Sequence, residues 1–330
     1  MGLPQREFGR TGWRVSPIGF GAWAIGGSWG DVSEAEAKST LAAALDAGVN
    51  FIDTADVYGD GRSERIVRDV LAGRQGERPL VATKAGRRLD PHVAQAYTFD
   101  AIEGFVDRSL ANLGVDTIDL LQLHCPPTDV YYRPELFAEL ERLAEKGKIR
   151  FLGVSVEKVE EAIKAIEYPN VVSVQIIYNM FRQRPRDRFF GDAREKGIAV
   201  IARVPLASGL LSGKMTAQST FAADDHRNFN RHGEAFDVGE TFAGVPYELA
   251  LEAVEKLRVL VPEGASMAQM ALRWILEDEA VSVVIPGART PGQARANAAA
   301  AELEPLAPEV MAAVSEIYET MIKPHVHQRW

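Results

Sequence analysis

Four side chains that could together transfer a proton stand at or just after short apolar runs of the sequence. Asp53, Lys84 and His124 each end such a run, and Tyr58 follows Asp53 by five residues. A phenol is a weak proton donor near pH 7 because its unperturbed pKa is about 10. A nearby ammonium lowers that pKa, so Lys84 could activate Tyr58 while Asp53 keeps Lys84 charged and oriented. His124 could then polarise a carbonyl oxygen, and the set would suit protonation of an alkoxide as hydride arrives from a cofactor.

Each of these residues also has an ordinary structural explanation. Lys84 could be a solvated strand end, and Asp53 could cap the following turn. Tyr58 could be a packing aromatic residue and His124 a hydrogen-bonded core histidine. Their joint position at successive strand ends favours the catalytic interpretation.

Eight β-branched or Leu-rich runs alternate with amphipathic stretches along the whole chain, which is typical of βα units around a parallel sheet. Such a number of units in a chain of 330 residues predicts an α/β fold, a (β/α)8 TIM barrel forming one domain over residues 1–330. In this fold the strand ends meet at one rim, where the active site lies. The predicted strands are 18–21, 51–53, 80–84, 118–124, 149–155, 171–175, 199–203 and 281–286, and the predicted helices are 33–47, 63–72, 98–113, 134–145, 157–166, 185–196 and 247–260.

Three further segments lie outside the repeated strand–helix units. Residues 5–17 contain the turn Gly-Arg-Thr-Gly between short extended runs, which predicts a hairpin that plugs the barrel floor. Residues 214–245 show neither helical nor strand periodicity, and so long a loop in a compact domain indicates a lid over the substrate or the cofactor. A helix is expected at 309–323.

Composition narrows the possible functions. The net charge is -9 and no long Lys/Arg run occurs, so a surface for nucleic acid or anionic membranes is not expected. The single cysteine, Cys125, permits no internal disulfide, and the cytoplasm is the expected compartment. No signal peptide and no apolar run of about 20 residues is visible, so we expect neither secretion nor membrane insertion. The oligomeric state is not predicted.

Several segments resemble the signature motifs of the aldo-keto reductase superfamily, in the right order along the whole chain. They are FIDTADVYG (51–59), VATK (81–84), LLQLH (120–124), GFGAW (19–23), IRFLGVS (149–155), VQIIYN (174–179), VPLASGLLSGK (204–214) and IPGARTPGQARAN (285–297). The resemblance implies an NADP(H)-linked reductase of aldehydes or ketones. Its catalytic tetrad would be Asp53, Tyr58, Lys84 and His124, with Tyr58 as the general acid.

The same resemblance implies a set of cofactor contacts. Ser155 and Gln175 would bind the nicotinamide carboxamide, residues 205–210 with Lys214 would surround the pyrophosphate, and Arg289 would favour NADPH over NADH. Backbone donors and basic groups near a helix start are suited to anions; the less favoured alternative is that Arg289 is a surface arginine and 205–213 an ordinary loop. The full set of expected cofactor contacts is Ala22, Trp23, Asp53, Ser155, Gln175, Arg203, Pro205, Leu206, Ser208, Gly209, Leu210, Lys214, Gly287, Arg289, Gln293 and Asn297.

Two positions depart from the commonest family pattern. Val156 stands where many members have an asparagine that contacts the carboxamide, so the side chain that usually makes this contact is missing here. Arg203 stands where a tyrosine or tryptophan often covers the nicotinamide ring. A guanidinium can stack but adds positive charge, which leads to the hypothesis that Arg203 favours NADPH over NADP⁺.

The expected substrate wall comprises Trp23, Trp29, Tyr58, His124 and loop residues 224–231. Tryptophans stack on a sugar ring or an aryl group and the loop's polar residues can bind hydroxyls, so the expected substrate is a polyhydroxylated aldehyde such as an oxidised hexose. The loop contacts could instead hold the lid closed or grip the adenosine phosphate. His325 and His327 alone do not make a metal site, and no metal is predicted.

Two other functions stay open at this point. The superfamily includes barrel subunits of ion channels that bind NADP(H), so the chain could be a regulatory subunit with little turnover. The same site could also act as an alcohol or sugar dehydrogenase, since such a site catalyses both the reduction of a carbonyl group and the oxidation of the alcohol.

Overall fold

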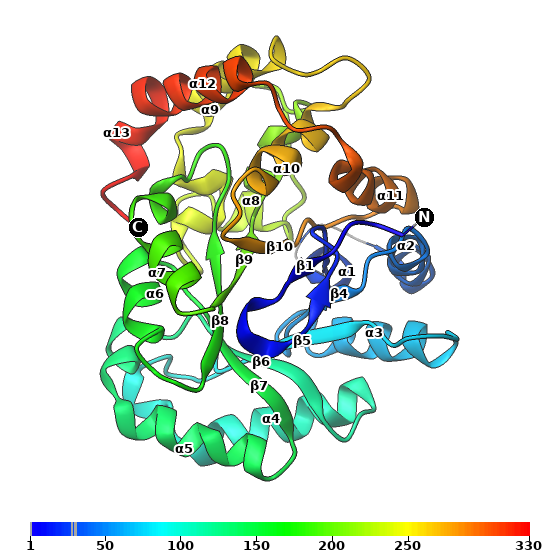
Figure 1. Cartoon of the computed structure of the whole chain (residues 1–330), viewed down its shortest axis with the longest axis vertical. Helices are drawn as coiled ribbons and strands as arrows, with labels where there is room; N and C mark the ends of the chain where they lie inside the picture. The colour runs from blue at the N-terminus through cyan, green and yellow to red at the C-terminus, as the bar shows by residue number, and fades with distance from the viewer. Residues whose placement is uncertain (1, 28, 30–31) are drawn as a thin grey trace.

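Eight parallel strands follow one another in chain order around a curled sheet in the computed structural model, which describes residues 2–27, 29 and 32–330 (Figure 1). The first and last strands are joined by bridges from Ile18 to Val284 and from Gly21 to Gly287. The predicted (β/α)8 barrel is therefore confirmed. The strands are β3 (Phe20–Gly21), β4 (Phe51–Asp53), β5 (Leu80–Ala85), β6 (Ile118–His124), β7 (Ile149–Ser155), β8 (Val171–Ile177), β9 (Ala199–Arg203) and β10 (Val281–Val284).

Helices follow the strands and cover the outside of the barrel (Figure 1). All seven helices predicted between strands are present within a few residues of their expected bounds. The longer helices are α2 (Glu34–Asp46), α3 (Arg62–Ala72), α4 (Phe99–Leu113), α5 (Pro134–Glu145), α6 (Val159–Ala165), α7 (Phe189–Glu195), α9 (Tyr247–Arg258), α10 (Met267–Leu276), α11 (Pro291–Ala299) and α12 (Pro308–Ile317); the shortest are α1 (Trp23–Gly26), α8 (His226–Phe229) and α13 (Lys323–Val326).

Helices α10 and α11 are absent from the predicted set. Helix α10 is buried on most sides, from Met267 to Leu276, so few polar residues mark an outer face. Helix α11 is rich in alanine and buries few residues. The expected helix at 309–323 is interrupted: α12 ends at Ile317, and a wider helical turn, Tyr318–Ile322, leads into α13.

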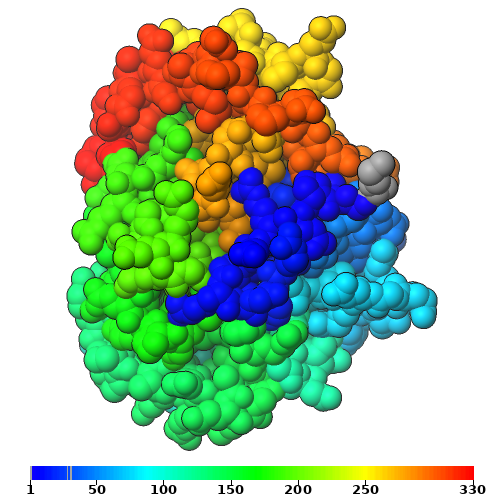
Figure 2. All heavy atoms as spheres, viewed as in Figure 1, coloured from blue at the N-terminus to red at the C-terminus, as the bar shows by residue number. Residues whose placement is uncertain are grey.

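The N-terminal hairpin closes the barrel floor, as predicted. Strands β1 (Arg6–Glu7) and β2 (Arg14–Val15) pair antiparallel, and this segment lies across the middle of the face shown in Figure 2. Phe8 is buried and stacks on Phe51 at 5.2 Å between ring centroids. It belongs to an apolar cluster of inward side chains from several strands, which fills the barrel below the site.

The predicted lid, residues 214–245, is mostly irregular, but the expectation of no helix there is wrong for three short pieces. These are α8 and the 3-10 turns Val238–Glu240 and Phe242–Gly244. Local polar contacts hold the irregular parts of the lid together. For example, Asn230 Oδ1 accepts hydrogen bonds from the backbone N–H groups of Ala235 and Phe236. The C-terminal residue also anchors the lid, since the Trp330 indole N–H donates to Asp237 at 2.8 Å.

No helix within the described ranges is both long enough and apolar enough to cross a bilayer.

Candidate active site

A cavity of about 750 Å³ opens at the carboxyl ends of the strands. Its walls come from the strand ends, from the lid and from the starts of α10 and α11. Tyr58, Asp53 and His124 line it together, as the strand-end argument predicts. Of the expected cofactor contacts, every residue lines the cavity except Leu210, whose buried side chain packs in the outer apolar core.

Lys84 lies behind Tyr58 and is completely buried. Its ammonium donates to Asp53 Oδ1 at 2.5 Å, to the Thr54 carbonyl at 2.9 Å and to Tyr58 Oη at 3.2 Å. Burial lowers the Lys84 pKa, but the carboxylate of Asp53 and the phenol oppose this and leave the pKa above its usual value. Lys84 is therefore charged and aimed at the phenolic oxygen.

The second oxygen of Asp53 is held by two glutamines. Gln122 Nε2 donates to Asp53 Oδ2 at 2.9 Å, and Gln175 Nε2 donates to the same atom at 2.7 Å. Gln122 was not among the predicted site residues. The sequence does indicate Gln122 as a site residue, because it lies two positions before His124 in a buried strand and so points to the same side of the sheet.

Tyr58 is held close to α1 by an approach that only glycine permits. A Cβ at Gly59, where φ is +60°, would lie 2.0 Å from the Gly26 carbonyl oxygen, and a Cβ at Gly26 would lie 2.7 Å from Tyr58 Cβ. The Tyr58 and Trp23 rings are nearly parallel, with centroids 5.9 Å apart.

The expectation that Lys84 leaves Tyr58 with a lowered pKa needs a correction. Burial raises this pKa, and although Lys84 lowers it as predicted, the net shift is upward. The phenol thus stays protonated throughout the neutral range, as a proton donor must.

His124 is buried beside Tyr58, with ring centroids 5.9 Å apart and the planes nearly perpendicular. Burial, followed by the charges of Lys84, Arg87 and Arg203, lowers its pKa well below the usual value. The imidazole is therefore neutral. Its Nδ1 has no hydrogen-bond partner among the described residues.

Aromatic side chains form one wall of the cavity. Trp23 and Trp29 meet edge to face at 5.6 Å, and the His226 ring of the lid lies 4.7 Å from Trp23 and 4.4 Å from Trp29. Within 224–231, only Arg227 lines the cavity. Asn230 holds the lid's own backbone instead, which supports part of the alternative explanation for this loop.

The far end of the cavity is basic. Lys214 and Arg289 line it, together with Ser266 and Thr290, which cap the starts of α10 and α11. Arg227 also lines the cavity, but it pairs with Asp225 and lies 4.9 Å over the Trp29 ring, at the aromatic wall. Between β9 and Lys214 the non-glycine residues Val204, Ala207 and Ser208 have positive φ, a conformation that the surrounding structure must hold in place. Helix starts and basic groups facing one space are suited to phosphates.

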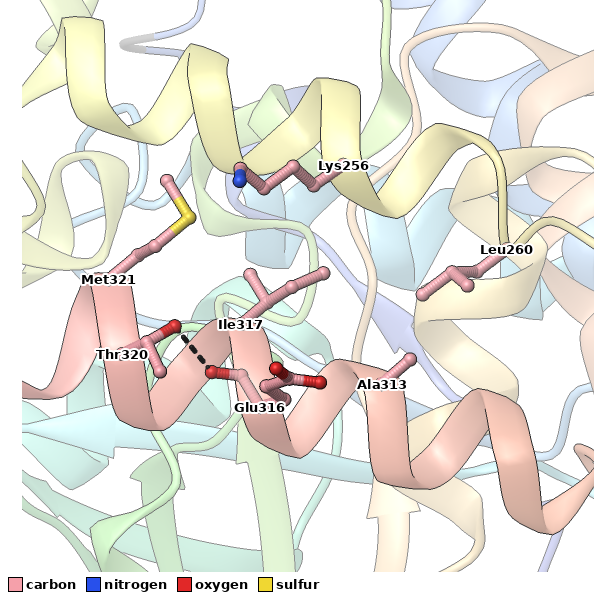
Figure 3. A pocket seen from close by; sticks show the side chains of 7 residues that line it. All are labelled: Lys256, Leu260, Ala313, Glu316, Ile317, Thr320 and Met321. Carbon is pink, nitrogen blue, oxygen red and sulfur yellow. Dashed lines mark hydrogen bonds between the residues drawn. The ribbon is translucent and has the colours of Figure 1, made fainter.

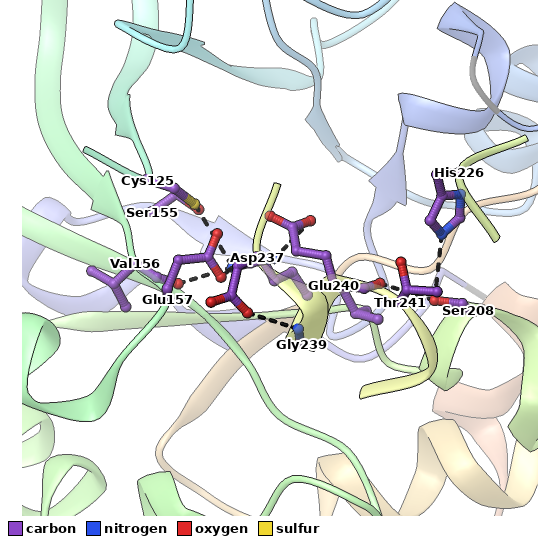
Figure 4. Close-up of polar contacts among 12 residues, drawn as sticks. Cys125, Ser155, Val156, Glu157, Ser208, His226, Asp237, Gly239, Glu240 and Thr241 are labelled. Atoms are coloured by element: carbon purple, nitrogen blue, oxygen red, sulfur yellow. Dashed lines mark hydrogen bonds and ion pairs between the residues drawn. The ribbon is translucent and has the colours of Figure 1, made fainter. Parts of the chain in front are cut away.

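Arg203 is enclosed by carboxylates that the sequence did not point to. Its guanidinium lies 2.9 Å from Glu157 and 3.2 Å from Glu240, and the other oxygens of these two carboxylates lie 3.6 Å and 3.8 Å from Arg87. We call Arg87, Glu157, Arg203 and Glu240 the charge quartet. Figure 4 shows its Glu157, after β7, facing the lid segment that carries Glu240.

The positive charge of Arg203, on which the hypothesis of a preference for NADPH over NADP⁺ rests, is not alone in the structure, because each arginine of the quartet has two carboxylate neighbours. The preference itself stays a prediction. Cys125 Sγ and the two carboxylates also lie within 4.8 Å of one another, but Arg203 approaches all three. Ion pairing therefore explains this group of acidic residues.

A second, smaller hollow of about 280 Å³ lies between α9 and α12 (Figure 3). Lys256, Glu316 and several aliphatic side chains line this hollow. The Thr320 hydroxyl, which also lines it, donates its hydrogen bond to the backbone carbonyl of Glu316. It contains none of the grouped proton-transfer residues of the main cavity.

Comparison with known proteins points to one family. The model of the Aldo/keto reductase family matches residues 17–319. Aldo-keto reductase YhdN of Bacillus subtilis is 35% identical over 297 residues, covering 87% of this chain and 85% of the relative. The 6-dehydroglucose reductase of Novosphingobium aromaticivorans is 31% identical over 310 residues, covering 87% of this chain and 97% of the relative. The structure of glycerol dehydrogenase AKR11B4 from Gluconobacter oxydans has a TM-score of 0.77 at 30% identity, covering 98% of this chain and 96% of that one.

Proposed function

This chain belongs to the aldo/keto reductase family and is an oxidoreductase that uses a nicotinamide cofactor, and from that premise we propose that it reduces a polar, sugar-like aldehyde or ketone with NADPH. The observation that carries the proposal is the position of Lys84, within 2.5 Å of Asp53 and 3.2 Å of Tyr58 at the cavity that also contains His124.

The four residues divide the work of proton transfer. The nicotinamide, when bound, supplies the hydride. Tyr58 gives its proton to the carbonyl oxygen, and the Lys84 ammonium stabilises the phenolate that remains. Asp53 keeps Lys84 charged. The neutral His124 donates a ring N–H to the same oxygen and adds no charge of its own.

The cavity fits a dinucleotide along its length. Both contacts of the Gln175 amide nitrogen are within the protein, to Asp53 and Gln122, so its carbonyl oxygen is left to accept from a carboxamide, next to Ser155. Residues 205–209 and Lys214 then border the pyrophosphate. Gly287, Arg289, Gln293 and Asn297 border the adenosine end, where the Arg289 guanidinium suits a 2′-phosphate and hence NADPH.

The aromatic wall supports a sugar-like substrate. Trp23 and Trp29 offer apolar faces to the carbon skeleton near Tyr58 and His124. Two of the similar proteins are named for glycerol and 6-dehydroglucose, which are hydroxylated compounds. Lid residues 214–245 would close this end of the cavity over the substrate.

Loss of NADPH absorbance with a panel of aldehydes, including sugar aldehydes, tests the proposal. Turnover should fall at least about a hundredfold in Tyr58→Phe, because general acid catalysis typically contributes that much, while NADPH binding persists. Tyr132→Phe, at an exposed tyrosine outside the cavity, is the matched control. Tight NADPH binding without turnover of any aldehyde would favour a regulatory subunit, and faster turnover with alcohols and NADP⁺ would favour a dehydrogenase.

A further inference from the structure

Three polar side chains share the interior of the barrel just beneath the cavity. Asp53, Gln122 and Gln175 come from β4, β6 and β8, which are alternate strands. In this fold the inward side chains of alternate strands form one layer. The residues two positions earlier on β4 and β6, Phe51 and Leu120, belong to the apolar cluster that fills the barrel below. This polar layer therefore separates the apolar core from the cavity.

The hydrogen bonds of the polar layer form a closed triangle. Gln122 and Gln175 each donate from Nε2 to Asp53 Oδ2, at 2.9 Å and 2.7 Å, and Gln175 Nε2 also donates to Gln122 Oε1 at 3.0 Å. Because a carboxylate only accepts, Asp53 requires the nitrogen of each amide to face it. An amide nitrogen has two N–H donors, so both donors of Gln175 are used within the triangle. Two acceptors fix the plane of the Gln175 amide, whereas one acceptor would leave the amide free to rotate.

The two glutamines differ in what they can reach. Gln175 lines the cavity, and its Oε1 accepts no hydrogen bond from the described residues and is not enclosed by them. Gln122 is completely buried and lies outside the cavity wall. Any effect of Gln122 on a bound molecule is therefore exerted through Gln175 or through Asp53.

We propose that Gln122 is a positioning residue for the cofactor: its Oε1 orients the Gln175 amide so that Gln175 Oε1 faces the carboxamide of the nicotinamide. This inference rests on the proposed function and adds to it the residue that prepares the acceptor before the cofactor binds. An acceptor that is fixed in advance loses less conformational freedom on binding, so the carboxamide N–H group is bound more tightly.

The alternative is a purely structural role for Gln122, which would only complete the hydrogen bonds of Asp53 inside the barrel. The two explanations concern different atoms of one amide. Positioning uses Gln122 Oε1, which accepts from Gln175, and support of Asp53 uses Gln122 Nε2. Variants that keep one atom and lose the other therefore separate them.

The first test removes the donor of the cofactor. In reduced 3-acetylpyridine adenine dinucleotide phosphate a methyl group replaces the carboxamide nitrogen, so this analogue cannot donate to Gln175. Wild type should bind NADPH about tenfold more tightly than the analogue, which leaves a desolvated acceptor unpaired. Gln122→Met, which keeps the side-chain length without the amide, should reduce this preference to about threefold or less. Fluorescence titration measures both affinities, and a preference that Gln122→Met leaves unchanged would overturn the proposal.

Two further variants assign the effect to one atom. Gln122→Glu retains an oxygen that accepts from Gln175, so it should retain the NADPH preference even though it alters the support of Asp53. Loss of the preference in Gln122→Glu as well as in Gln122→Met would favour the structural role and contradict the proposal. Ser173→Ala is the matched control, because Ser173 is completely buried two positions before Gln175 and lies outside the cavity wall. It should leave the preference at its wild-type value.

A double variant tests whether Gln122 acts through Gln175. Gln175→Met removes the acceptor itself and should abolish the preference. Adding Gln122→Met should leave the affinity ratio of that variant unchanged, because residues that act in one chain of contacts are not additive. A ratio that changes again would argue against the proposal. If Gln122→Met does not fold, Gln122→Asn replaces it, since the shorter amide withdraws its oxygen from Gln175 and should also lose the preference.

Binding separates a failure of this inference from a failure of the proposed function. If no aldehyde is reduced, the proposed reductase activity fails, but the affinity ratios do not depend on turnover and still decide the role of Gln122. If wild type binds NADPH and the analogue equally well, Gln175 does not receive the carboxamide. That result would contradict this inference whether or not aldehydes are reduced.

Discussion

Gly59 and Gly26 approach so closely that a Cβ on Gly59 would lie 2.0 Å from the Gly26 carbonyl oxygen. The contact joins the loop that carries Tyr58 to the short helix that carries Trp23. Backbone packing thus determines where the phenol lies before any side-chain contact is considered.

Gly59→Ala should therefore reduce activity by displacing Tyr58. The positive φ of +60° adds backbone strain to the steric overlap, so the free energy of unfolding should fall by about 2 kcal/mol. kcat should fall at least about tenfold, because misplacement of a reacting group by 1 Å is that costly. Denaturant unfolding and steady-state kinetics measure both effects. Gly73→Ala is the control, since nothing lies within 4 Å of a Cβ there, and equal effects of the two substitutions would contradict the argument.

Lys84→Met should separate catalysis from cofactor binding. The single-turnover rate should fall about a hundredfold or more, because the phenolate loses its ammonium, while the NADPH dissociation constant changes little. The substitution also leaves Asp53 buried without its counter-ion, which typically costs about 3–5 kcal/mol.

Lys84→Met combined with Asp53→Asn should recover stability but not the rate. Stopped-flow fluorescence and denaturant unfolding report the two quantities separately. Recovery of the rate in the double variant would show that Lys84 acts only by supporting the structure.

Asp56 should make stability fall as pH rises from about 4 to about 7. It is completely buried, neither carboxylate oxygen has a hydrogen-bond partner among the described residues, and burial followed by repulsion from Glu64 raises its pKa to about 7. A raised folded-state pKa means that the stabilising effect is full below the unfolded pKa of about 3.9 and is lost as pH rises through about 7.

Asp56→Asn keeps the neutral form at every pH. Its free energy of unfolding should gain on that of wild type by on the order of 3 kcal/mol between pH 5 and pH 8.5, with most of the gain below pH 7. Urea titrations at both pH values measure this. Asp129→Asn, at an exposed carboxyl, should show no such divergence, and parallel pH profiles for Asp56→Asn and wild type would contradict the prediction.

Arg203→Leu tests the cofactor hypothesis in its revised form. The substitution leaves Glu157 and Glu240 facing Arg87 alone, so one net negative charge remains near the nicotinamide. The ratio of the NADPH to the NADP⁺ affinity should fall several-fold, because the oxidised ring carries a positive charge. Fluorescence titration with each cofactor gives the ratio. Adding Glu240→Gln makes the remaining charged groups neutral overall and should return the ratio toward its wild-type value. If neither substitution changes the ratio, charge plays no part in the choice between the two cofactors.

The barrel and the tetrad could be predicted because each depends on short sequence runs. Asp53 and His124 end their strands and Lys84 is the last residue but one of β5, and strand ends meet in this fold wherever the helices lie. Gln122 was equally predictable from alternation along its strand, but a lone glutamine attracts no chemical interpretation.

The quartet could not be predicted in this way. Arg87 and Glu157 follow their strands by two residues, and only the folded loops decide which way they point. Glu240 lies in a segment without periodicity, so nothing in the sequence relates it to Arg203. Leu210 differs from its neighbours in the motif: it stands inside a matching segment, yet its side chain packs in the core.

The alternating charges of the quartet also constrain how the sequence can vary. A change of sign at any one of positions 87, 157, 203 and 240 leaves a buried charge unmatched, whereas paired changes keep the balance. Homologous chains with an aromatic residue at position 203 should therefore have lost an acidic residue at 157 or 240 as well. Four positions spread over half the chain would then be inherited as one unit, and their covariation would record the contact even where no structure is known.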